Sequence, residues 1–170
     1  SGTTFPSAVG SFTRRSMHEY DEEGLDASGT YIEDHPGGPI IVSVYVRPSP
    51  PILSIGSPEE VVEDARRRLT EQVWEEEKAQ IVRSHAGAEM AGEGPYDLDR
   101  SGGRVSGHRA VFHYDEPFAG REQTVRSLLI LFTYVGEKWD IKYRISHPDG
   151  LEAMEDIAAF TRQERALMAF

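Results

Sequence analysis

The chain has 170 residues, a formal net charge of −11 and no cysteine. With this acidic balance we expect neither nucleic-acid binding nor docking on anionic membranes, because both depend on clustered Lys and Arg. The lack of cysteine excludes disulfides, thiol nucleophiles and cysteine-ligated metals. No stretch approaches the roughly 20 apolar residues of a membrane helix, so we also predict no membrane insertion.

The first part of the chain is predicted to form a loose lead-in followed by three strands. Residues 1–10 make up the lead-in, and residues 11–170 are predicted to form a single domain. Strands are predicted at 12–20, 25–33 and 40–47, the last of which is rich in β-branched residues. Turn-forming clusters separate the three strands, so they are expected to pair as an antiparallel meander.

A helix is predicted at 58–84, after a proline-rich loop at 48–57. In this prediction Ser57 is the N-cap, Pro58 takes the first helical position, and Glu60 completes a capping box. One face of the helix carries an apolar stripe, as expected for a helix that packs on a sheet. The stripe consists of Val62, Ala65, Leu69, Val73, Trp74, Ile81 and Val82.

The segment after the helix, residues 87–104, is Gly-rich and polar, and we predict that it forms an unstructured loop. A strand at 105–114 follows. The next strand contains an apolar run at 128–132, and it belongs inside a sheet because both of its faces need cover. Gly136 and Glu137 are predicted to form a type II′ turn into the next strand.

The last strand pattern, at 138–146, alternates apolar and polar residues, which is typical of a strand with one buried face. A final helix is predicted at 151–168. The predicted fold class is therefore α+β: an antiparallel sheet of about six strands with two main helices packed on it, in the order βββα-βββα. In this architecture the run 128–132 is sandwiched in the middle of the sheet, and the two helices cover it.

The chain has six histidines, and none has the HxxxH or HExxH spacing of a helical metal site. His108 and His113 lie five residues apart on one strand, so we expect them to face opposite sides of the sheet. We predict no metal site and no cofactor. Neither a serine-nucleophile elbow nor a phosphate-binding loop ending in Gly-Lys-Ser/Thr is present, so no catalytic residue is assigned.

A row of cations lies on the polar face of the last strand. Lys138, Lys142 and Arg144 share this face in a strongly acidic chain, which suits an anionic group or the acidic segment of a partner. The alternative is that these cations pair with the chain's own Glu and Asp residues. The predicted ligand-binding residues are these three cations together with His108 and His113.

Short motifs occur at three places along the chain: Pro6, Gly10 and Phe12, then Val44-Tyr45-Val46, and finally Lys142 and Arg144. These motifs resemble those of uncharacterised bacterial exported proteins. The element order is also similar to the PsbP-like α/β sandwich, a fold with binding and assembly roles. This resemblance implies no catalytic residues and favours a periplasmic or secreted location, with a cytoplasmic one left open.

Together these features favour a non-enzymatic binding or accessory protein that engages a protein or a small ligand through the sheet face or the 87–104 loop. The alternative is a small hydrolase or lyase with a site near the 87–104 loop and the 105–114 strand. A pocket that contains a histidine and a carboxylate within hydrogen-bond reach would favour the enzyme.

Overall fold

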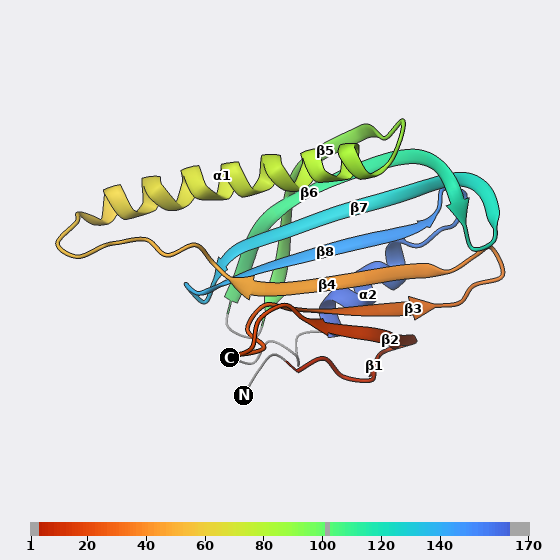
Figure 1. Ribbon diagram of the computed structural model, residues 1–170, viewed down its shortest axis with the longest axis horizontal. Helices are drawn as coiled ribbons and strands as arrows, with labels where there is room; N and C mark the ends of the chain where they lie inside the picture. Colours follow the sequence, from red (N-terminus) through yellow and green to blue (C-terminus); the bar gives the residue numbers. More distant parts are fainter. Residues whose placement is uncertain (1–3, 101–102, 164–170) are drawn as a thin grey trace.

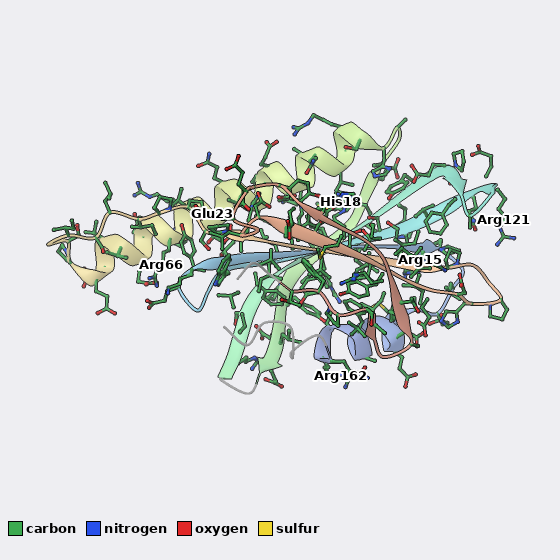
Figure 2. All side chains as sticks on the ribbon, turned by 60° about the horizontal axis from the view of Figure 1, so that its bottom comes forward. Arg15, His18, Glu23, Arg66, Arg121 and Arg162 are labelled. Carbon is green, nitrogen blue, oxygen red and sulfur yellow. The ribbon has the colours of Figure 1, made fainter. Side chains whose placement is uncertain are left out.

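The computed structural model describes residues 4–100 and 103–163. Within these residues one antiparallel sheet of eight strands, in the order β1-β2-β3-β4-β8-β7-β6-β5, carries a helix on each side (Figures 1 and 2). The strands are β1 (Ala8–Val9), β2 (Phe12–Glu19), β3 (Ala27–Glu33), β4 (Ile40–Pro48), β5 (Glu89–Arg100), β6 (Gly103–Phe118), β7 (Arg121–Val135) and β8 (Trp139–Pro148). The helices are α1 (Glu59–Ser84) and α2 (Met154–Gln163).

The predicted fold class was wrong, because the described chain is mostly sheet. It has eight strands instead of about six, and the helices follow runs of four strands instead of three. One additional strand, β1, lies in the predicted lead-in, where Phe5 and Val9 are buried. The other, β5, occupies the segment that was predicted to be an unstructured loop.

Strand β5 forms against its local composition. It contains Gly92, Gly94 and Pro95, which disfavour strands, yet it pairs with β6 from end to end. Because β5 lies at the edge of the sheet, Pro95 can be accommodated without breaking an internal ladder. Tyr96 and Leu98 pack against the core, so their alternation with aspartates was a strand signal.

The run 128–132 lies in the interior of the sheet, as predicted, with every side chain at most 2% exposed. Its residues alternate between two cores. Leu128 and Phe132 belong to the core on the α2 side, which includes Phe160 of α2. Leu129 and Leu131 belong to the core on the α1 side, together with Trp74 and Ile81. The two faces of this strand therefore pack into the two cores on opposite sides of the sheet.

Helix α1 differs from its prediction at the N-terminus. Pro58 is the N-cap and makes no side-chain capping bond, and the backbone N–H of Ser57 donates to Ser54 O in the preceding turn. The predicted Ser57–Glu60 capping box is therefore wrong. Of the predicted stripe, Trp74 and Ile81 are buried, whereas Val82 is 51% exposed.

Helix α2 begins at Met154, and the part of its prediction at 164–168 lies outside the described residues. None of the helices in the described chain is long and apolar enough to cross a membrane.

The β7–β8 connection also differs from its prediction. Gly136 and Glu137 both have positive φ angles, of 56° and 65°, which is the type I′ pattern; a type II′ turn needs a positive φ only at the first position. Tyr134 also has a positive φ, of 52°, beside an irregularity in the β7–β8 register. This bend turns the end of β7 toward the proline-rich loop.

Candidate functional site

The cations predicted to form one ligand site are divided between two places. Lys142 Nζ lies 2.8 Å from Glu77 Oε2 of α1 and 4.4 Å from the centre of the Tyr45 ring. Burial lowers the pKa of Lys142, against the opposing effect of Glu77. Lys142 thus pairs with the chain's own acid, as in the alternative above, although the partner comes from a helix. Lys138 instead lines a pocket beside the β7–β8 turn.

His108 and His113 face opposite sides of the sheet, as predicted. His108 stacks on Trp74 of α1, with ring centres 5.3 Å apart. His113 Nδ1 lies 3.3 Å from Asp149 Oδ1 on the other face. There His113 lines a cavity of about 320 Å³, here called the arginine pocket. The arginine pocket is lined by Ala91, Gly92, Glu93, Arg109, Val111, His113 and Arg126.

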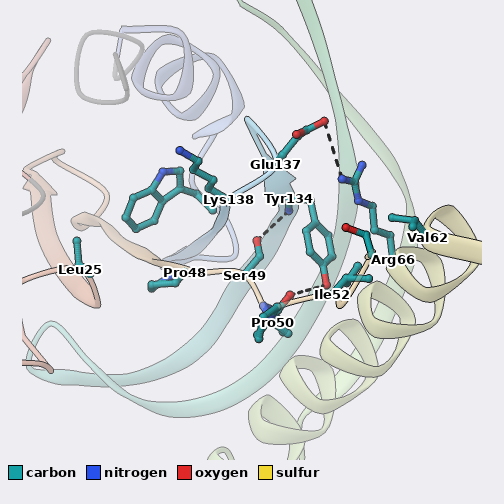
Figure 3. Close-up of a pocket in the computed structure, with 13 residues that line it drawn as sticks. Leu25, Pro48, Ser49, Pro50, Ile52, Val62, Arg66, Tyr134, Glu137 and Lys138 are labelled. Atoms are coloured by element: carbon teal, nitrogen blue, oxygen red, sulfur yellow. Dashed lines mark hydrogen bonds and ion pairs between the residues drawn. The ribbon is translucent and has the colours of Figure 1, made fainter. Parts of the chain in front are cut away.

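The strongest candidate site lies where β4 ends. Pro48, Pro50 and Pro51 lack the N–H donors that a continuing strand would need, so the chain leaves the sheet and forms a loop before α1. Between this loop, the β7–β8 turn and α1 lies a cavity of about 430 Å³, here called the proline-loop pocket (Figure 3). Its lining is mainly apolar and aromatic. The lining residues are Leu25, Pro48, Ser49, Pro50, Pro51, Ile52, Ser54, Val62, Arg66, Tyr134, Glu137, Lys138 and Trp139.

A buried carboxylate shapes the wall of the proline-loop pocket. Asp140, 2% exposed, accepts a 2.6 Å hydrogen bond from Ser49 Oγ. The backbone N–H of Tyr134 donates to Ser49 Oγ at 3.2 Å and to Asp140 Oδ1 at 3.3 Å. These bonds tie the start of the proline-rich loop to the bend at the end of β7. The pocket is therefore held in shape before any ligand enters.

Tyr134 adds a second tie. Its hydroxyl donates to Pro50 O at 3.1 Å (Figure 3). Burial and the nearby Asp140 carboxylate raise the pKa of Tyr134, so the hydroxyl stays protonated and remains a donor at neutral pH. The ring is thereby fixed as part of the pocket wall, which limits the loss of side-chain entropy on binding.

The polar edge of the pocket carries two cations and one acid. Arg66 of α1 lies 3.9 Å from Glu137 and has its guanidinium 5.7 Å from the centre of the Tyr134 ring (Figure 3). Glu137 is 80% exposed, so this ion pair is weak. Lys138 is the second cation. The net charge at the edge is positive in a strongly acidic chain, which suits an anionic group.

A second cavity, of about 560 Å³, adjoins the same loop. It shares Pro48, Ser49, Pro50 and Pro51 with the proline-loop pocket and is closed by α1 residues that include Leu69 and Val73. Further along the loop, Leu53 is 89% exposed and Ile55 is 97% exposed. The region around the proline-rich loop thus contains two cavities and exposed apolar side chains.

Sequence reasoning found Lys138 but missed Ser49, Arg66, Tyr134 and Asp140. Asp140 lies between Lys138 and Lys142 in the row of cations on β8. A carboxylate in that position could have indicated a local hydrogen-bond network. The prolines were recognised only as a loop. No local pattern links residues 49, 66 and 134, because they meet only through the tertiary structure.

A different group of side chains provides donor atoms of the kind that hold metals. Glu33, His35 and Asp156 each offer one such atom, and these atoms lie within 4.8 Å of one another. They lie near the turn whose Gly37 O accepts a bond from Arg121. Arg121 and Arg66 are at opposite ends of the molecule (Figure 2), so this group is remote from the proline-loop pocket.

Comparisons with known proteins assign no function to any of these sites. No protein-family model matches the chain, and no curated protein sequence matches it.

Proposed function

We propose that this chain is a non-enzymatic binding protein that takes a small amphipathic anion into the proline-loop pocket. The observation that carries this proposal is the pre-shaped cavity of about 430 Å³ with apolar walls and two cations at its edge. Small-ligand sites are commonly clefts of about 300–1,000 Å³ with mostly apolar linings and a few polar groups. The ligand's apolar body would contact Ile52 and Tyr134, and its anionic end would lie near Lys138 and Arg66.

The make-up of the pocket supports binding over catalysis. Among the described residues that line it there is no histidine, and its one acidic residue, Glu137, is largely exposed. General acid–base chemistry needs a group with a pKa close to the working pH, held within reach of the reacting atoms. The hydroxyls of Ser49 and Tyr134 already form hydrogen bonds that hold the pocket wall in place. These features favour retention of a ligand without its conversion.

Titration calorimetry with 8-anilinonaphthalene-1-sulfonate, which has apolar rings and an anionic end, tests the proposal. We expect saturable one-to-one binding with a dissociation constant tighter than about 1 mM. Ile52→Asp should weaken it roughly tenfold or more, equivalent to about 1.4 kcal/mol. Leu53→Asp adds the same charge at the next residue, which is 89% exposed and does not line the pocket, and should leave binding unchanged.

The cationic edge is tested in the same assay. Arg66→Glu should weaken binding of the sulfonate, whereas Arg68→Glu, at a residue that lies outside the pocket lining and is 75% exposed, should not. No saturable binding, or equal losses in the members of both matched pairs, would reject the proline-loop pocket as the site.

A small hydrolase or lyase is a second candidate, supported by one observation in the arginine pocket. His113 and Asp149 lie 3.3 Å apart, and an imidazole oriented by a carboxylate is the usual arrangement of a general base. Arg109 and Arg126 line the same cavity and could hold an anionic substrate. Hydrolysis of p-nitrophenyl acetate and p-nitrophenyl phosphate tests this candidate.

An enzyme of this kind would lose turnover in His113→Asn and keep it in His85→Asn. His85 is a matched control because its Nδ1 also lies near a carboxylate, 2.8 Å from Glu116, but outside the arginine pocket. The enzyme hypothesis is rejected if the wild type shows no turnover, or if the two substitutions reduce turnover equally.

A further inference from the structure

Three side chains converge where β3 ends and α2 begins. Glu33 is the last residue of β3, His35 follows two positions later, and Asp156 lies in the first turn of α2. His35 Nε2 is 3.2 Å from Glu33 Oε2 and 3.5 Å from Asp156 Oδ2. One imidazole nitrogen and two carboxylate oxygens therefore face one another at a junction between the sheet and a helix.

Two of these atoms are not satisfied by the described part of the chain. Glu33 Oε2 and His35 Nε2 are sealed from solvent and make no hydrogen bond there. Buried polar atoms are nearly always hydrogen-bonded or coordinated, because leaving them unpaired costs free energy. The Asp156 side chain is 33% exposed, so the group is open on one side. A single bound cation would be coordinated by all three ligand atoms, and water could complete its coordination.

The distances match the spacing of ligands around a small divalent ion. Ligand atoms about 2.0–2.2 Å from a tetrahedral zinc ion lie about 3.3–3.6 Å from one another. The separation of 3.5 Å between His35 Nε2 and Asp156 Oδ2 lies within this range, and the separation of 3.2 Å between His35 Nε2 and Glu33 Oε2 is just below it. An imidazole in the set favours zinc and neighbouring transition metals over calcium and magnesium, which prefer oxygen ligands alone.

We propose that Glu33, His35 and Asp156 form a binding site for a divalent transition metal ion, with zinc as a representative ligand. The site would connect the end of β3 to the start of α2 and would therefore stabilise the docking of α2 on the sheet. It departs from the sequence-based prediction of no metal site, because the third ligand comes from a residue more than a hundred positions away. The competing arrangement has no metal, and His35 then contacts the two carboxylates directly.

The test is calorimetric titration and thermal unfolding of the full chain with zinc chloride at about pH 7.5, where histidine is mostly neutral. We expect one saturable zinc ion per chain and a higher melting temperature with zinc. Asp156→Asn and His35→Gln should each weaken zinc binding roughly tenfold or more and remove the thermal shift. Cobalt(II) should give visible absorption bands of a low-symmetry nitrogen–oxygen site, which the same variants lose.

Asp34→Asn is the matched control, because Asp34 lies between Glu33 and His35 in sequence, is 81% exposed and is outside the group. It should bind zinc as the wild type does. Asp156→Asn, at a partly exposed position, keeps the test decisive if His35→Gln does not fold. Absence of saturable zinc binding overturns the proposal in favour of the arrangement without a metal. Zinc binding that survives both site substitutions also overturns it, since the ion would then lie elsewhere.

Discussion

On the α2 side of the sheet, Leu128, Ile130 and Phe132 pack into an apolar core. On the α1 side the sheet also has an apolar core, but β8 presents Lys142 to Glu77 there. Apolar side chains stabilise a core without needing a specific partner, because the hydrophobic effect is non-directional. Buried charges stabilise only when their partners are in place. We therefore expect the α1 face to depend on individual residues more strongly than the α2 face does.

Loss of the Glu77 charge should have the largest effect. Glu77 is 5% exposed and accepts a hydrogen bond from Lys142, so Glu77→Gln leaves Lys142 without its buried counter-charge, whereas Arg47, 3.5 Å from Glu77, keeps Asp140 at 3.8 Å. Removing one partner of a buried ion pair typically costs about 3–5 kcal/mol. Urea unfolding measures the loss. Glu76→Gln, at a neighbouring side chain that is 69% exposed, should cost little.

The double substitution Glu77→Gln with Lys142→Met sharpens the result, because it removes both charges of the pair. Most of the lost stability should return. Equal stability of Glu77→Gln and Glu76→Gln would show that the α1 face does not depend on this pair.

Substitutions at two adjacent leucines of β7 compare the stabilities of the two faces of the sheet directly. Leu128 is 1% exposed on the α2 side and Leu129 is 0% exposed on the α1 side. Leu128→Ala and Leu129→Ala should each destabilise the fold by about 2–5 kcal/mol, through lost burial and the cavity left behind. Urea unfolding should give similar values for both. A much smaller loss at Leu129 would mean that α1 covers its face only part of the time, and Leu53→Ala on the exposed loop serves as the surface control.

The smallest expected effect is a change in how the stability of the fold depends on pH. His147 is 1% exposed on β8, and burial lowers its pKa below the ordinary value of 6.5. As the pH falls through 6.5 the unfolded chain takes up a proton at His147 before the folded chain does, so the folded state loses stability between 6.5 and the lower folded pKa. His147→Gln should flatten this part of the stability–pH curve, measured by urea unfolding at several pH values.

His18 is exposed and provides the control for that measurement. His18→Gln should leave the curve unchanged. If His147→Gln retains the wild-type slope below pH 6.5, then other groups cause the acid sensitivity of the fold.

Local patterns in the sequence were sufficient for most strands, for α1 and for the buried run 128–132. Alternation and β-branched residues predict which segments are strands and which side chains face inward. They failed for β5, because a Gly-rich edge strand is held by backbone pairing with β6, and such pairing leaves little trace in side-chain composition. The number of strands was underestimated by two, because the two-residue strand β1 in the predicted lead-in was also missed.

The sequence alone determined that this chain buries an apolar strand on both sides and that β8 has one polar face. Only the tertiary structure determined what the polar residues contact: Lys142 reaches Glu77, Asp140 holds Ser49 at the proline-loop pocket, and His35 meets Asp156. The physical reason is the range of the interactions. Burial follows from residue type and local periodicity, whereas ion pairs and pockets depend on which distant segments the strand order brings together.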